Sequence, residues 1–172
     1  MLPIQLSLVD KYSEFDFIIA GVNSHSEEYY RSFIGERNNV KLIYDNTYSI
    51  LNNAHCAVVT SGTATLETAL FNVPEVVCYK ANALSFLAAK YLVKIQYISL
   101  VNIILKESAV VELLQDKWNE DCLEKEFKKI CFDETYREQM QYLFNKLKNI
   151  LGDSGASPSI AQSIIENLNN KK

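Results

Sequence analysis

The sequence is poor in the residues that build metal sites and disulfide frameworks. Among 172 residues it contains four Cys and two His. The cysteines form no Cys-x-x-Cys pair and neither His has a partner at a recognisable ligand spacing, so a zinc site is not expected. A domain of this length buries enough apolar surface to fold without disulfides. We therefore predict free thiols, no metal, no cofactor and a reducing, cytoplasmic environment. The cysteines are Cys56, Cys78, Cys122 and Cys131.

Long hydrophobic runs and a strong charge bias are also missing. Charged residues interrupt residues 1–30, and no run approaches the ~18 apolar residues of a membrane-spanning helix. The net charge is -4, with 48% hydrophobic and 22% charged residues, values that are ordinary for a globular protein. We expect a soluble chain that binds no nucleic acid.

Two glycine-rich nucleotide motifs are absent as well. No G-x-G-x-x-G opens a helix, and no G-x-x-x-x-G-K-[ST] loop occurs. These absences argue against a dinucleotide-dependent oxidoreductase and against a P-loop nucleoside triphosphatase.

Short apolar strands instead alternate with helical segments along the chain. Strands are predicted at 15–20, 40–44, 57–60, 75–79 and 97–100, and helices at 25–33, 47–53, 63–71 and 82–94. This alternation is typical of an α/β, Rossmann-like parallel sheet of about five strands with flanking helices. No strand pattern follows Asn102. From residue 108 onward we expect three or four helices, the longest at 134–151, then a hinge and a last helix at 158–168.

The turn after the third predicted strand is the strongest candidate site. Thr60-Ser61-Gly62-Thr63-Ala64 ends the strand and opens a helix. Free N–H groups at Ser61, Gly62, Thr63 and Ala64 would favour an anion such as phosphate. Capping of the helix by the hydroxyl groups needs no ligand, and spacing alone leaves both interpretations open. On this helix we place Leu66, Ala69 and Leu70 on the inward face and Glu67 on another.

The sequence around this turn resembles the donor-binding half of lipid-A-disaccharide synthase. The resemblance runs through the stretches 60–71, 73–74, 76–80, 97–102, 112–115 and 155–157, in the same order as in that family. The family is an inverting glycosyltransferase of GT-B architecture, with two Rossmann-like domains. The resemblance implies that residues 1–151 form the nucleotide-sugar-binding domain, and that residues 152–172 form a hinge and a C-terminal crossover helix.

By this resemblance, the complete enzyme transfers 2,3-diacylglucosamine from UDP-2,3-diacylglucosamine to 2,3-diacylglucosamine 1-phosphate in lipid A biosynthesis. The family's N-terminal acceptor domain, which carries a catalytic carboxylate, has no counterpart in this sequence. We therefore expect no catalytic residue here, UDP binding without turnover, and the acceptor domain as a partner. The resemblance also leaves room for a homodimer and for peripheral contact of the full enzyme with the inner membrane.

The resemblance assigns roles to several polar residues. Glu67 would hold the ribose of the donor, whereas the alternative is a solvated acid that suits the helix dipole. Asn102 would read the uracil edge or a sugar hydroxyl, or else only cap a turn. Tyr79, Lys80 and Gln115 are second-rank candidates, since a surface lysine or a solvent-facing glutamine explains them equally well. Many relatives have Pro where Val101 stands and Gly-Arg-Glu where residues 106–108 fall, which weakens the transfer of contacts in that loop.

Two other functions remain open from the sequence. One is a non-catalytic nucleotide-binding or dimerisation module with an exposed apolar surface. The other is a sugar-nucleotide epimerase-like domain, although the usual Ser-Gly-Gly turn with paired acids is not what residues 61–67 contain.

Overall fold

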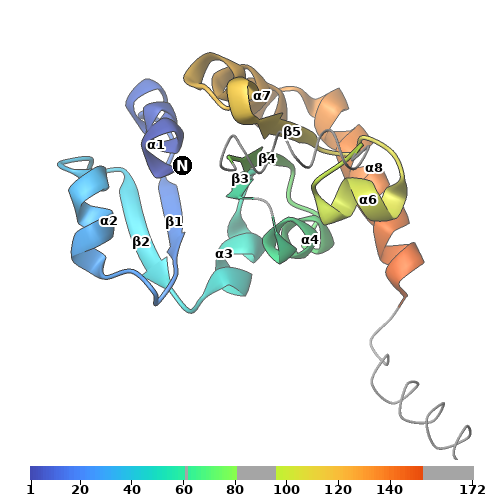
Figure 1. The fold of residues 1–172 in the computed structure, drawn as a ribbon, viewed down its shortest axis with the longest axis horizontal. Coiled ribbons are helices and arrows are strands. Elements are labelled where there is room, and N and C mark those ends of the chain that lie inside the picture. Colours follow the sequence, from blue (N-terminus) through green and yellow to red (C-terminus); the bar gives the residue numbers. More distant parts are fainter. Residues whose placement is uncertain (61, 81–95, 153–172) are drawn as a thin grey trace, which may run out of the picture.

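The computed structural model describes residues 1–60, 62–80 and 96–152 (Figure 1). Helices and strands alternate as the sequence predicts for an α/β fold. The helices are α1 (Leu2–Lys11), α2 (Glu27–Ile34), α3 (Thr47–Asn53), α4 (Thr63–Leu70), α6 (Leu100–Leu105), α7 (Glu120–Phe132) and α8 (Glu134–Leu151), with a short 3-10 helix η1 (Gln115–Lys117). The strands are β1 (Phe17–Gly21), β2 (Val40–Tyr44), β3 (Ala57–Thr60), β4 (Glu75–Tyr79) and β5 (Val111–Leu114).

The strands form two parallel sheets rather than one continuous sheet. β1 pairs with β2, and β3, β4 and β5 pair in that order. In Figure 1 the two sheets lie side by side, with β1 nearer than β2 to the second sheet. Every pairing is parallel, so the α/β prediction with about five strands is confirmed. The arrangement is that of a Rossmann-like half of a GT-B fold.

The position of the fifth strand was predicted wrongly. Residues 97–100 do not form a strand; residues 96–98 have no regular structure and α6 begins at Leu100. Ser99 is the N-cap of this helix, and its hydroxyl oxygen accepts a hydrogen bond from the Asn102 N–H (3.2 Å). The fifth strand is instead β5, in a region where we expected only helices. Its short apolar run contains Glu112.

Several other boundaries were predicted closely. β2, α3, β3, β4 and α8 have the expected bounds, and α2 and α4 differ by one or two residues at their ends. Side-chain caps explain where two of these helices begin. Ser26 accepts a hydrogen bond from the Tyr29 N–H at the start of α2, and Asp133 accepts one from the Tyr136 N–H at the start of α8. The predicted helices at 82–94 and 158–168 lie outside the described residues.

The main hydrophobic core lies between the second sheet and the helices α4, α6, α7 and α8. Side chains of this core that are almost completely buried include several from β4 and from the inward faces of α7 and α8: Val76, Val77, Leu123, Ile130, Phe144 and Leu147. A smaller cluster joins α1 and α2 to the first sheet, and Phe17 packs against both clusters. No described helix has the length and apolar character needed to span a membrane.

Candidate functional site

The backbone at the start of α4 requires glycine. Gly62 is the N-cap and has φ 142 and ψ -161, a region that side-chain-bearing residues rarely adopt. An added Cβ at this position would meet nothing within 4 Å, so the space over the turn is open. Ser61, the first residue of the predicted anion site, lies outside the described residues. Gly62, Thr63 and Ala64 are all exposed.

The first turn of α4 has N–H groups that no described side chain caps. Gly62 supplies no side-chain cap, which is also true of the residues that begin α1 and α3, whereas α2, α6, α7 and α8 each begin with a side-chain oxygen that accepts from a backbone N–H. The hydroxyls of Thr65 and Thr68 do not act as caps, because they donate to the carbonyl oxygens of Gly62 and Ala64 (both 2.8 Å). The helix start therefore presents donors and partial positive charge to solvent.

Glu67 lies one turn further along α4 and is half-buried. Four residues of helix separate it from Thr63, which is about 6 Å along the axis. Within the described residues its carboxylate makes no hydrogen bond and no ion pair. The buried face of α4 consists of Thr65, Thr68 and Ala69, so our placement of Leu70 on that face was wrong: Leu70 is 36% exposed.

Asn102 is buried and its side chain is fully engaged inside the protein. It is 1% exposed and lies within α6 rather than after a strand. Its Nδ2 donates to the Val110 carbonyl oxygen and to Glu112 Oε1 (both 2.9 Å). Its Oδ1 accepts from the N–H groups of Ala109 (2.8 Å) and Val110 (3.0 Å). Every hydrogen-bonding position of this amide thus has a partner, and none is directed to a ligand.

Glu112 is the polar residue that our sequence reasoning missed. Its carboxylate accepts hydrogen bonds from the backbone N–H groups of Ile98 and Ser99 (both 2.9 Å) as well as from Asn102. It therefore holds the segment before α6 against β5. The available signal was a single acid within the apolar run 110–114.

The strand register places the second-rank residues at the same edge as the α4 turn. Thr60 of β3 pairs with Cys78, and Tyr79 pairs with Leu114. Tyr79 therefore ends β4 next to the end of β3, Lys80 follows it, and Gln115 follows the end of β5. Lys80 is exposed, while Tyr79 and Gln115 are half-buried. In parallel sheets ligands bind at this edge, beyond the carboxyl ends of the strands.

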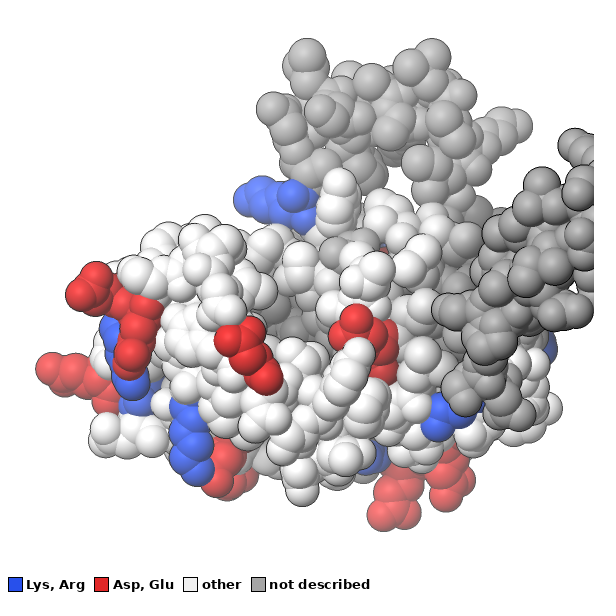
Figure 2. Space-filling view, turned by 90° about the horizontal axis from the view of Figure 1, so that it is seen from below, with Lys and Arg blue, Asp and Glu red and all other residues white. Residues whose placement is uncertain are grey.

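The ends of β1 and β2 carry a further polar pair that the sequence did not indicate. Asn23 Nδ2 donates to both carboxylate oxygens of Asp45, at 2.9 Å each. Figure 2 views the molecule from below, the side toward which β1 and β2 run in Figure 1. On this face acidic and basic side chains are scattered among uncharged residues.

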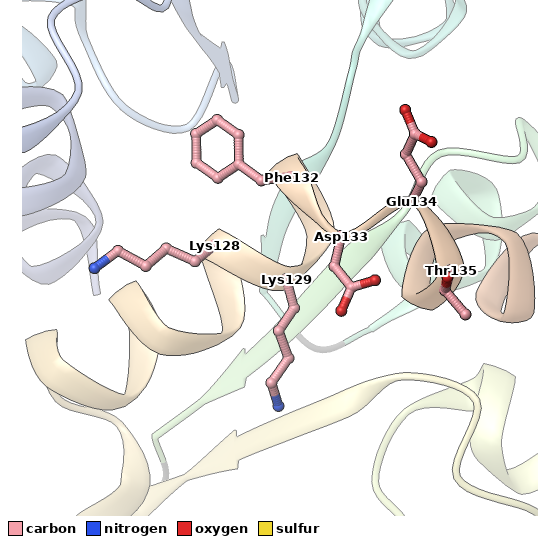
Figure 3. Close-up of a pocket in the computed structure, with 6 residues that line it drawn as sticks. All are labelled: Lys128, Lys129, Phe132, Asp133, Glu134 and Thr135. Carbon is pink, nitrogen blue, oxygen red and sulfur yellow. The ribbon is translucent and has the colours of Figure 1, made fainter.

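A pocket of about 760 Å³ lies elsewhere, at the junction of α7 and α8 (Figure 3). Its lysines are already paired, Lys128 with Glu124 (2.8 Å) and Lys129 with Glu126 (2.9 Å). The two lysines Lys11 and Lys128 hold the pKa of the Glu124 carboxyl at about 2. Because this junction contacts the start of β3 rather than its end, the pocket is separate from the α4 turn. No group of three or more His, Cys, Asp or Glu in the described residues could hold a metal ion.

Comparison with known proteins places most of the chain in one family. A family model described as lipid-A-disaccharide synthetase matches residues 3–161. The lipid-A-disaccharide synthase of Syntrophus aciditrophicus is 33% identical over 167 residues, covering 94% of this chain and 44% of that protein. The corresponding synthase of Nitrosococcus oceani is 36% identical over 134 residues, 78% of this chain and 34% of that protein. This chain thus spans less than half the length of these curated relatives.

Proposed function

Because the chain belongs to the lipid-A-disaccharide synthetase family, we propose that it forms the part of such a glycosyltransferase that binds the nucleotide-sugar donor. In this proposal the donor is UDP-2,3-diacylglucosamine, and its diphosphate lies over the first turn of α4. The observation that carries the proposal is the uncapped, exposed helix start at Gly62, Thr63 and Ala64, with open space over Gly62. Backbone N–H groups in this position are donors suited to phosphate oxygens.

Glu67 is the proposed partner of the ribose. Its carboxylate has no partner within the described residues, and an ionised carboxylate accepts hydrogen bonds from vicinal hydroxyl groups. Its distance of about 6 Å along α4 from the first turn matches a sugar attached to a diphosphate at that turn. Lys80 lies at the same edge of the sheet, where it adds positive charge near the diphosphate.

In this proposal Asn102 does not contact the donor but holds neighbouring backbone in place. Its four hydrogen bonds and those of Glu112 fix the segment 97–99 and the start of α6 against β5. Asn102 is therefore a positioning residue, and contact with uracil falls to other groups. Tyr79 and Gln115 stay second-rank candidates for the donor, since both lie at the carboxyl ends of their strands.

The proposed chemistry is transfer of the diacylglucosaminyl group to 2,3-diacylglucosamine 1-phosphate with release of UDP. As the glycosidic bond to the diphosphate breaks, negative charge grows on the leaving phosphate oxygen. Preorganised N–H donors at the α4 start stabilise that charge. The general base that activates the acceptor hydroxyl belongs to the acceptor domain, so we propose that this segment alone binds UDP without turnover.

Calorimetric titration of the chain with UDP tests the proposal. We expect Glu67→Ala to weaken UDP binding by about 10- to 150-fold, because it removes a charge-assisted contact of roughly 1.5–3 kcal/mol. The control is Glu138→Ala, an exposed acid on α8, which should leave UDP affinity unchanged. In thermal unfolding, the stability of each variant should differ from that of the unchanged chain by no more than about 0.5 kcal/mol.

One result would remove the proposed role of Glu67, and two others would favour a different function. Equal UDP affinity in Glu67→Ala would rule out the ribose role. No heat from UDP, together with self-association in gel filtration, would favour a dimerisation module. Epimerisation of a UDP-N-acetylhexosamine by the chain, followed by NMR, would favour the epimerase-like alternative.

A further inference from the structure

Two cysteines that are distant in the sequence meet at the edge where the strands of the second sheet begin. Cys56 directly precedes β3 and Cys131 is the second-last residue of α7. Their Sγ atoms lie 3.0 Å apart. A disulfide bond is about 2.05 Å long, so bond formation requires an approach of only about 1 Å.

The backbone on both sides of the pair is held in place by neighbouring side chains. His55 Nε2 donates to the carbonyl oxygen of Cys131 (2.9 Å). The Arg137 guanidinium donates to the carbonyl oxygen of His55 (3.1 Å) and to that of Ile130. The two residues that Arg137 contacts, His55 and Ile130, directly precede Cys56 and Cys131 in the sequence. The Arg137 side chain of α8 thus links both cysteine-bearing segments and holds the two sulfur atoms close together.

The two thiols differ in accessibility and acidity. Cys56 is half-buried, while Cys131 is 6% exposed. The hydrogen bond between the two thiols and the nearby Arg137 charge lower the pKa of the Cys56 thiol. The same hydrogen bond and burial raise the pKa of Cys131. A partly exposed thiol with a lowered pKa is the better nucleophile toward an external disulfide.

We propose that Cys56 and Cys131 form a redox-active dithiol site that closes to an intramolecular disulfide by exchange with a low-molecular-weight disulfide such as oxidised glutathione. The Cys56 thiolate attacks one glutathione sulfur, forms a mixed disulfide and releases one glutathione thiolate, which takes up a proton. Cys131 then gives its proton to solvent, attacks Cys56 Sγ and releases the second glutathione. Two S–H bonds are lost, one S–S bond forms, and oxidised glutathione is reduced to two thiols.

The site is distinct from the proposed donor site. The four residues of β3 lie between Cys56 and the α4 turn, a span of about 13 Å at the rise of a strand. Figure 3 shows the adjoining end of α7, where Phe132 and Asp133 follow Cys131 in the sequence. The disulfide would fasten the start of β3 to the end of α7 and leave the carboxyl edge of the sheet unobstructed.

Treatment of the whole chain with oxidised glutathione, followed by alkylation and intact mass spectrometry, tests the site. We expect a product about two mass units lighter than the reduced chain before alkylation, and one that takes up two fewer alkyl groups than the reduced chain does. Peptide mapping without reductant should give a Cys56–Cys131 crosslinked peptide, which dithiothreitol separates. This mapping uses the unmodified sequence, so it does not depend on how variants fold.

Single variants separate the roles of the two sulfur atoms. Cys131→Ser should accumulate a stable glutathione adduct on Cys56. Cys56→Ser should react at least about tenfold more slowly, because Cys131 is buried and less acidic. The matched controls are Cys78→Ser and Cys122→Ser, which should form the disulfide as the unchanged chain does. A persistent glutathione adduct on the unchanged chain, or a crosslink through Cys122, would overturn the proposal.

Discussion

The network around Asn102 gives the sharpest prediction about stability. Replacing Asn102 with Ala removes four hydrogen bonds of 2.8–3.0 Å in a region where Ala109 and Val110 are 6% and 1% exposed. The buried Val110 N–H, which donates to Asn102 Oδ1, would be left without a partner among the described residues, and the Ala109 N–H would keep only its bond to the Glu107 carbonyl oxygen (3.1 Å). At about 1 kcal/mol for each bond, we expect the free energy of unfolding to fall by about 3–5 kcal/mol.

Urea denaturation followed by the fluorescence of Trp118 measures this loss. Trp118 is the only tryptophan of the chain and is 4% exposed, so its emission reports global unfolding. The control is Asn149→Ala on the exposed face of α8, which should change stability by less than about 0.5 kcal/mol. A double-mutant cycle with Glu112→Gln should give a coupling energy of about 1–3 kcal/mol. Loss of less than 1 kcal/mol in Asn102→Ala would refute the structural role and return Asn102 to the list of donor contacts.

Three more predictions concern a buried acid, the site backbone and the core. Burial raises the pKa of the Glu75 carboxyl, and neither of its oxygens has a partner among the described residues. The folded state therefore binds more protons than the unfolded state above pH about 4.5, so the stability of the protein falls as the pH rises. In thermal melts Glu75→Gln should be more stable than the unchanged chain at pH 8, and this difference should vanish toward pH 4. Gly62→Val should abolish UDP binding in calorimetry, because valine strongly disfavours φ 142. Leu123→Ala, at a fully buried position of α7, should cost about 2–5 kcal/mol in urea denaturation.

Local signals were sufficient for most of the fold. β3 and β4 are short β-branched runs that end at a glycine turn and at an exposed lysine, and their bounds could be read directly. Asp133 at the start of α8 is a cap that sequence rules recognise. The break between the two sheets could not be predicted, because strand pairing depends on contacts distant in the sequence.

The fifth strand shows where local patterns fail. Tyr97 to Leu100 has the composition of a strand, but Ser99 caps a helix and Glu112 binds the preceding N–H groups. These partners are 13 and 14 residues apart, beyond any helical or strand period. The same tertiary contact explains why Asn102, expected at a strand end facing a ligand, is instead buried within α6.

In the candidate site, the sequence predicted the glycine turn and the acid on α4 but not the supporting contacts. The Gly62 backbone conformation follows from the residue type, and the exposed turn follows from the strand-to-helix change. The inward positions of Thr65 and Thr68 could not be predicted from the sequence, since threonine is usually taken for a polar, solvent-facing residue. Their hydroxyls donate to carbonyl oxygens of the preceding turn, which lets both residues face the core.

Amide NMR of the isotopically labelled chain during titration with UDP and with uridine tests whether a diphosphate binds at the start of α4. We expect UDP to shift the amide signals of Gly62, Thr63 and Ala64, and uridine, which lacks phosphate, to shift them far less. Shifts confined to the α7–α8 junction around Lys128 and Asp133, or equal shifts with both ligands, would contradict a diphosphate site at the start of α4.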